Sequence, residues 1–170
     1  MRDVEQLFRT YHETLVRYLT RRLGDRDWAE ELAQETFLRA LRQGEVENER
    51  AWLFAVATNL ARDEGRKQVR RRRHLQLLAE EAREAEKEMA PDGLERAEDA
   101  AAARRALDGL EERDRLALLM REEGLSYEEI AEALGLSVGS IGTTLFRARK
   151  RLVASYEEVT REKKGGYKAS

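Results

Sequence analysis

The chain has 170 residues and a net charge of −2, with 39% charged side chains, 6% aromatic side chains and a single proline. This composition favours helices with solvated outer faces over a sheet-based fold. Without cysteine there is no disulfide framework, thiolate metal site or cysteine nucleophile. No apolar run approaches the roughly 20 residues of a membrane span, and no secretory signal opens the chain. We therefore expect a cytoplasmic protein without membrane insertion.

Two helices are predicted near the start of the chain. Apolar side chains recur at helical spacing from Val4 to Leu23, and Gly24 is a stop signal. Asp27 and Glu30 have the spacing of a capping pair, which predicts a second helix over 28–42. The inward face of that second helix is expected to consist of Leu32, Leu38 and Leu41.

A third helix is predicted from about Ala51, apolar at first and basic toward its end. Residues 51–78 contain seven basic and two acidic side chains, a net charge of +5, whereas residues 79–114 have a net charge of −7. Such block patterning usually means a charged partner for one block and a solvated role for the other. The acidic total therefore does not exclude DNA binding.

The periodicity predicts an all-α fold of two small helical domains. The apolar pattern fades after residue 78 and resumes near Leu94, and Pro91 interrupts the segment between them. We place a first domain at 1–78, an acidic flexible linker at 79–93, a second domain at 94–156 and a polar, frayed tail at 157–170.

The most specific segment begins at Ser126. Ser126 and Glu129 form a capping box that predicts a helix from Tyr127, and Gly135 permits the left-handed conformation that ends it. Ser137 can cap a second helix, whose buried stripe would be Ile141, Leu145, Ala148 and Leu152. This is the layout of a helix-turn-helix, which places its second helix in a DNA major groove. An ordinary capped helical hairpin is the alternative interpretation.

Four pieces of sequence occur in a definite order. They are GDRDWAEELAQETFLRA at 24–40, RAWLFAVATNL at 50–60, the basic cluster, and the helix-turn-helix ending in RARKRL at 147–152. With these pieces, residues 4–156 resemble the extracytoplasmic-function (ECF) group of the sigma-70 family of bacterial RNA polymerase sigma factors. The resemblance implies one domain for polymerase docking and the minus-ten promoter element, and one for the minus-thirty-five element.

The resemblance also implies roles for particular residues of the first domain. The segment that would dock on the coiled coil of the polymerase largest subunit comprises Glu31, Gln34, Glu35 and Phe37. An acidic and amide face suits an arginine-rich partner. The residues that match the family's minus-ten region are Trp52, Asn59, Arg62, Asp63, Arg66, Lys67, Arg70 and Arg71. The basic side chains would neutralise phosphates, and Asn59 would bond a base edge. Trp52 would stack on an unpaired base or belong to the core.

In the second domain, the DNA-binding residues implied by the resemblance are Ser137, Gly139, Ser140, Thr143, Thr144, Arg147 and Lys150. Many family members carry lysine or arginine where this chain has Gly142 and Thr144. That departure removes two basic contacts from the expected minus-thirty-five surface.

As a sigma factor, the chain would bind core RNA polymerase and direct promoter recognition, strand opening and transcription initiation. We expect an anti-sigma factor as a further partner, and no cofactor, metal, small-molecule substrate or enzyme activity. His12 and His74 lie far apart and have no metal-ligand spacing. A stand-alone helix-turn-helix regulator is the alternative, but the first eighty residues resemble a polymerase-docking domain.

Overall fold

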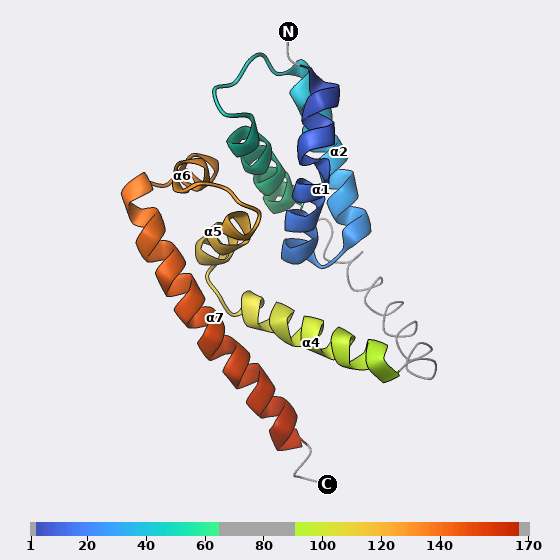
Figure 1. Ribbon diagram of the computed structural model, residues 1–170, viewed down its shortest axis with the longest axis vertical. Helices are drawn as coiled ribbons and strands as arrows, with labels where there is room; N and C mark the ends of the chain where they lie inside the picture. Colours follow the sequence, from blue (N-terminus) through green and yellow to red (C-terminus); the bar gives the residue numbers. More distant parts are fainter. Residues whose placement is uncertain (1–2, 65–90, 167–170) are drawn as a thin grey trace.

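The computed structural model describes residues 3–64 and 91–166 of the chain. Within these ranges the structure is helical throughout apart from short connections, and no strand occurs, which confirms the predicted all-α fold. The helices are α1 Val4–Leu23, α2 Arg26–Arg42, an unlabelled helix over 49–64, α4 Pro91–Asp108, α5 Glu112–Glu122, α6 Tyr127–Leu134 and α7 Val138–Gly166 (Figure 1).

The first half is built on the α1–α2 hairpin. Gly24 adopts a φ of 72° and closes α1, as predicted. The residue that caps α2 is Asp25, whose side chain accepts a hydrogen bond from the Trp28 N–H at 3.1 Å. The predicted cap, Asp27, instead lies in the first turn, because the glycine leaves the next residue extended and ready to cap.

Helix 49–64 packs beside α1 and completes the first half. Asn48 caps it by accepting from the Ala51 N–H at 2.9 Å. The buried Tyr18 hydroxyl of α1 bonds the Thr58 hydroxyl at 2.7 Å, and its ring lies 5.0 Å from that of Phe54. These contacts fix the rotation of helix 49–64 and so determine which of its side chains face solvent.

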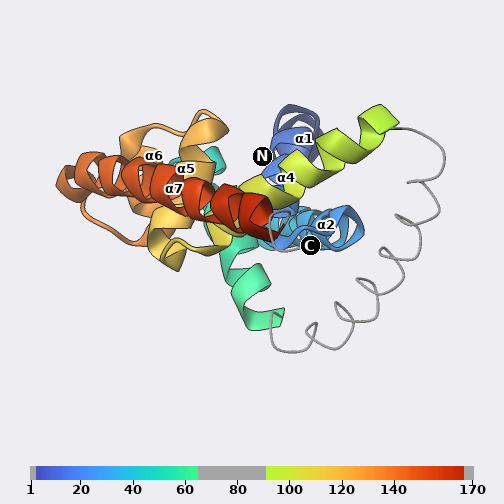
Figure 2. The same ribbon diagram turned by 90° about the horizontal axis from the view of Figure 1, so that it is seen from below.

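The second half packs α4, α5 and α6 against the 29-residue α7 (Figures 1 and 2). Helix α7 continues to Gly166, so the expected frayed tail is helical over 157–166. The preceding turns of α7 pack against α4, and just beyond the end of α4 a Cβ added to Gly109 would lie 2.5 Å from the Ser155 Oγ. Within the polar segment, Val159 and Thr160 are half-buried.

Helix α4 begins at Pro91, inside the range predicted as linker. Proline suits the first turn of a helix, where its missing N–H has no partner to lose. The remainder of the predicted linker, 79–90, lies outside the described residues.

The two halves share one hydrophobic core in the described structure. Leu15 and Leu19 of α1 belong to the same buried cluster as Leu116 and Met120 of α5, and α1 packs against α5. The halves are therefore in direct contact.

Candidate functional site

Helix α2 buries one stripe against α1 and leaves the other side free. Glu31 and Gln34 are exposed and Glu35 is partly exposed, as a docking surface requires. Leu38 and Leu41, which the periodicity placed inside, are instead 55% and 63% exposed. That prediction was wrong because the buried residues of α2 are Trp28, Ala29, Leu32, Ala33, Thr36, Phe37 and Ala40, a stripe that leaves positions 38 and 41 on the solvent side.

Phe37 lies in the core rather than on the docking surface. Its side chain is 5% exposed and meets the Phe8 ring edge-on, with centroids 5.0 Å apart. Phe8 in turn stacks on His12 at 4.3 Å. The sequence-based placement of Phe37 is therefore corrected: it lies on the α1-facing side of α2 and holds the exposed side in position.

The last turns of helix 49–64 bring together three of the predicted DNA-binding residues. Asn59, Arg62 and Asp63 are exposed, and the Arg62 guanidinium reaches the Asn59 side-chain oxygen at 3.5 Å. Trp52 is half-buried and packs against the core. The remaining predicted residues of this region, Arg66, Lys67, Arg70 and Arg71, lie outside the described residues.

The helix-turn-helix forms as predicted. The Ser126 hydroxyl accepts from the Glu129 N–H at 3.1 Å, and the Glu129 carboxylate accepts from the Ser126 N–H at 2.9 Å, which completes the capping box. Gly135 ends α6 with a φ of 68°. The predicted stripe of α7 is buried at Ile141, Leu145 and Ala148 and partly buried at Leu152.

The predicted recognition surface is only partly exposed. Its solvent-facing members are Ser137, Gly139, Thr143, Arg147 and Lys150, whereas Ser140 is half-buried. Thr144 is 4% exposed, so its assignment to the DNA-binding surface is corrected. Its position three residues after Ile141 places it on the inward side of α7.

Arg147 is exposed but already engaged. Its Nε and Nη2 atoms donate to the two carboxylate oxygens of Asp114 at 3.0 and 2.7 Å. These hydrogen bonds lower the pKa of the Asp114 carboxyl. The pair ties α7 to α5 and so sets the rotation of the recognition helix.

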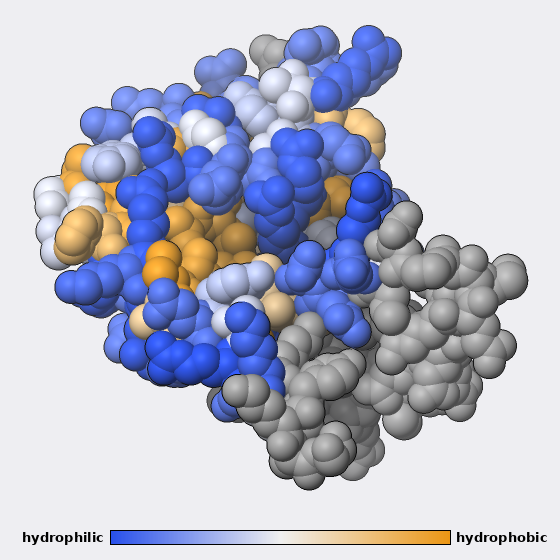
Figure 3. Space-filling view, turned by 60° about the horizontal axis from the view of Figure 1, so that its bottom comes forward, coloured by the Kyte–Doolittle hydropathy of each residue, from blue (hydrophilic) through white to orange (hydrophobic). Residues whose placement is uncertain are grey.

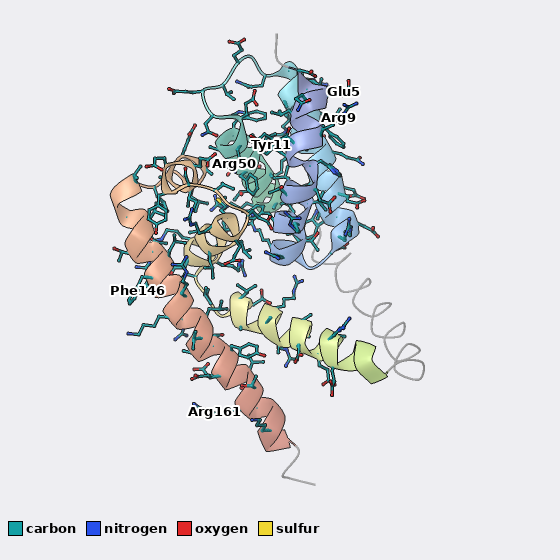
Figure 4. The ribbon with its side chains drawn as sticks, in the orientation of Figure 1. Glu5, Arg9, Tyr11, Arg50, Phe146 and Arg161 are labelled. Carbon is teal, nitrogen blue, oxygen red and sulfur yellow. The ribbon has the colours of Figure 1, made fainter. Side chains whose placement is uncertain are left out.

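One residue that the sequence reasoning missed stands on the same surface. Phe146 is 69% exposed, and its side chain projects outward from α7 (Figure 4). Farther along α7, Val153 and Tyr156 are also exposed. In the space-filling view, apolar surface lies between hydrophilic side chains on the face shown (Figure 3). The signal was present in the sequence, since an aromatic residue at 146 falls outside the buried stripe.

Comparison with known proteins decides the family. Residues 7–71 match the family model for sigma-70 region 2, and residues 100–152 match that for sigma-70, region 4. The chain is 32% identical over 166 residues to the RNA polymerase sigma factor YlaC of Bacillus subtilis, covering 92% of this chain and 95% of that protein. The chain belongs to the sigma-70 family of RNA polymerase sigma factors.

Other relatives of this sigma factor agree. It is 31% identical to the RNA polymerase sigma-H factor of Pseudomonas aeruginosa, with 95% of this chain and 90% of that protein covered. It is 32% identical to the ECF RNA polymerase sigma-E factor of Haemophilus influenzae, with 84% and 81% covered. The predicted membership of the ECF group is confirmed, and the protein acts in transcription initiation.

A solved structure shares the fold of this sigma factor. The sigma factor RpoE, crystallised with the anti-sigma factor NepR from Bartonella quintana, superposes with a TM-score of 0.64 at 22% identity, over 92% of this chain and 98% of that one. The stand-alone regulator is not favoured, because both sigma regions are matched in their expected order. Across residues 3–64 and 91–166, no helix is long and apolar enough to cross a membrane.

Proposed function

We propose that this sigma factor docks on core RNA polymerase through the outer face of α2. The observation that carries this proposal is an apolar pair, Leu38 and Leu41, left exposed on the helix that also presents Glu31 and Gln34 to solvent. Apolar surface contributes affinity when a partner covers it, and the carboxylates orient an arginine-rich partner. Glu35 belongs to the same face, and its carboxylate pairs with Arg39 at 3.3 Å.

The end of helix 49–64 is the proposed site for the minus-ten element. Asn59 is exposed and can bond a base edge, while Arg62 and the following basic residues provide phosphate contacts. The half-buried packing of Trp52 supports a role in holding this helix in place.

The first turns of α7 form the proposed site for the minus-thirty-five element. Nothing lies within 4 Å of a Cβ added to Gly139, so the backbone can approach the floor of the major groove. Phe146 offers an apolar contact to a thymine methyl group, and Lys150 offers a phosphate contact. Few basic side chains lie in these first turns of α7, which favours recognition of DNA by its shape and by apolar contact.

An anti-sigma factor is the proposed inhibitor of this protein. The proposed location is the cytoplasm, where core polymerase works. The support for the inhibitor is the fold shared with a sigma factor that was solved bound to one. We also propose that the chain contributes binding energy alone and no catalytic chemistry.

The decisive experiment measures the affinity of the full chain for purified core polymerase, followed by run-off transcription on a genomic library. Tight binding with new start sites is expected, and alignment of those sites gives both promoter elements. Retention on duplex DNA without core binding would contradict the docking assignment.

A further inference from the structure

Helix α7 carries an exposed apolar stripe besides the buried one that packs into the core. Phe146, Val153 and Tyr156 are 69%, 59% and 40% exposed. Together with the exposed Arg149 they recur at intervals of three and four residues, which places all four side chains on one face of the helix. This is the spacing of the seam along which two helices pack in a coiled coil. These four residues are called the α7 seam below.

The α7 seam is open to approach by another helix. In Figure 1, α7 forms one edge of the described structure, and α4, α5 and α6 all lie on its inner side. Phe146 projects from the outer side (Figure 4). The helix is also long and continuous, because it runs without a break from Val138 to Gly166. A second helix can therefore lie along it without displacing any element of the fold.

Charged side chains are placed symmetrically about the middle of the seam. Arg149 precedes Val153 by four residues, and Glu157 follows Val153 by four. Both are exposed, and among the described residues neither forms an ion pair. They lie about 12 Å apart along the helix axis, which is too far for a pair within one copy of α7. Their charges are therefore available to a partner of matching pattern.

From this pattern we propose that the protein forms an antiparallel homodimer through the α7 seam, with the twofold axis beside Val153. In that arrangement Arg149 of each copy lies opposite Glu157 of the other, and the symmetry forms this ion pair twice. A parallel dimer would instead set Arg149 against Arg149 and Glu157 against Glu157, so like charges would oppose it. Antiparallel packing also brings together opposite ends of the two helix dipoles.

The ends of the interface fit the same register. Phe146 of one copy lies opposite Thr160 of the other, seven residues on the far side of Val153. The Thr160 hydroxyl already donates to the Tyr156 and Glu157 carbonyls, both at 3.0 Å, so it needs no polar partner across the interface. From 146 to 160 the contact extends over about 21 Å of helix. Such a contact is small for a protein interface, so a weak dimer with a micromolar dissociation constant is expected.

The dimer does not depend on the proposed function. Val153 and Tyr156, at the centre of the interface, have no part in the assigned docking or DNA surfaces. Phe146, which the proposed function assigns to DNA, lies only at the ends of the interface. The two proposals therefore succeed or fail separately.

Sedimentation velocity on the full-length chain, from low micromolar to near-millimolar protein, tests the dimer. The native chain should pass from monomer to dimer as its concentration rises. Val153→Glu places two like charges at the twofold axis and should weaken dimerisation by about tenfold or more. The matched control is Ala154→Glu, which adds the same charge at the next exposed position, about 100° around the helix. It should dimerise as the native chain does.

An exchange of charges tests the register. Arg149→Glu or Glu157→Arg alone creates two like-charge contacts and should weaken dimerisation by about tenfold. The two changes combined restore opposite charges across the interface and should return the dissociation constant to within about threefold of the native value. Arg151→Glu and Glu158→Arg are the matched controls, because they make the same changes at exposed positions away from the seam. Far-ultraviolet circular dichroism on each variant verifies that the helices persist.

Three results would overturn the proposal. One is a native chain that stays monomeric at every concentration, which would leave the α7 seam to another macromolecule. Another is a dimer that Val153→Glu and Ala154→Glu weaken equally, and the third is a dimer that the combined charge exchange fails to restore. Since neither polymerase nor DNA is present, a monomeric chain that binds core polymerase would keep the proposed function and reject the dimer.

Discussion

Arg147 and Asp114 form a two-bond ion pair that joins α7 to α5, with Nε to Oδ2 at 3.0 Å and Nη2 to Oδ1 at 2.7 Å. A basic residue near the end of a recognition helix suggests a phosphate contact, but here its planar guanidinium is matched to a buried carboxylate. The pair sets how α7 is presented before any DNA arrives.

We therefore expect Asp114→Ala to lower the free energy of unfolding by about 1.5–3 kcal/mol, the range for hydrogen bonds to charged groups. Urea denaturation followed by circular dichroism measures this. The matched control is Asp108→Ala, because Asp108 is exposed and pairs with Arg115 within the same half. Equal midpoints for the two variants would contradict a structural role for the Arg147–Asp114 pair.

Charge reversal on α2 tests the docking surface. Glu31→Lys with Glu35→Lys should weaken core polymerase binding at least tenfold, since each like-charge contact in an arginine-rich interface costs affinity. The control, Glu45→Lys with Glu47→Lys, makes the same charge change in the exposed loop after α2. Fluorescence anisotropy with labelled protein gives both affinities. Native affinity in the first variant removes these residues from the interface.

The salt dependence of promoter-complex formation tests the basic cluster. With Arg66, Lys67, Arg70 and Arg71 replaced by alanine, promoter-complex formation should weaken. The slope of the logarithm of the binding constant against the logarithm of the salt concentration should become less steep by up to about 3, because fewer counterions are released on binding. Core binding should stay intact. A steep, native-like slope would show that these residues do not contact phosphates.

Gly142 allows a gain-of-function test. A Cβ at this position would meet only Tyr127, at an ordinary 3.7 Å, so Gly142→Lys fits without rearrangement. The lysine should raise affinity for the minus-thirty-five duplex and steepen its salt dependence. Replacing a helical glycine also adds up to about 1 kcal/mol of stability. Gly142→Gln is the uncharged control, and equal affinity for the two variants would place this side of α7 away from DNA.

Acid should loosen the contact between the halves. Because Arg50 depresses the pKa of Glu129 from 4.5 to about 2, the stabilisation is complete above pH 4.5 and is lost as the pH falls toward 2. The pKa of Glu112 is lowered too, chiefly by its hydrogen bond from Arg62. Urea midpoints measured between pH 6 and about 2.5 should fall less steeply for Glu129→Gln. Parallel curves would contradict the ionised pair.

Local signals in the sequence predicted most of the helices. The Ser126–Glu129 capping box and the glycine at 135 act within a few residues of themselves, so they predicted α6 and the turn correctly. The cap of α2 was misassigned because two aspartates, Asp25 and Asp27, compete within three positions. Local chemistry alone does not decide between them.

Tertiary contacts account for the other differences. Leu38 is exposed because no neighbouring helix of the described structure covers it, whereas Thr144 is buried because neighbouring helices do. Periodicity alone does not reveal which positions a neighbour covers. The polar end of α7 continues a helix whose preceding turns pack against α4, a tertiary contact that the local sequence does not reveal. The pairing of Glu112 with arginines 50 and 90 residues away required the folded chain.

Helix α7 runs unbroken from the recognition residues to the far side of α4. At 1.5 Å per residue, its 29 residues span about 43 Å without a joint. Because the helix is continuous, its first turns, which the proposed function assigns to DNA, and its distal turns around Tyr156 and Arg161 form one rigid element. A partner that binds the distal turns would therefore act on an element whose orientation is set by the Arg147–Asp114 pair.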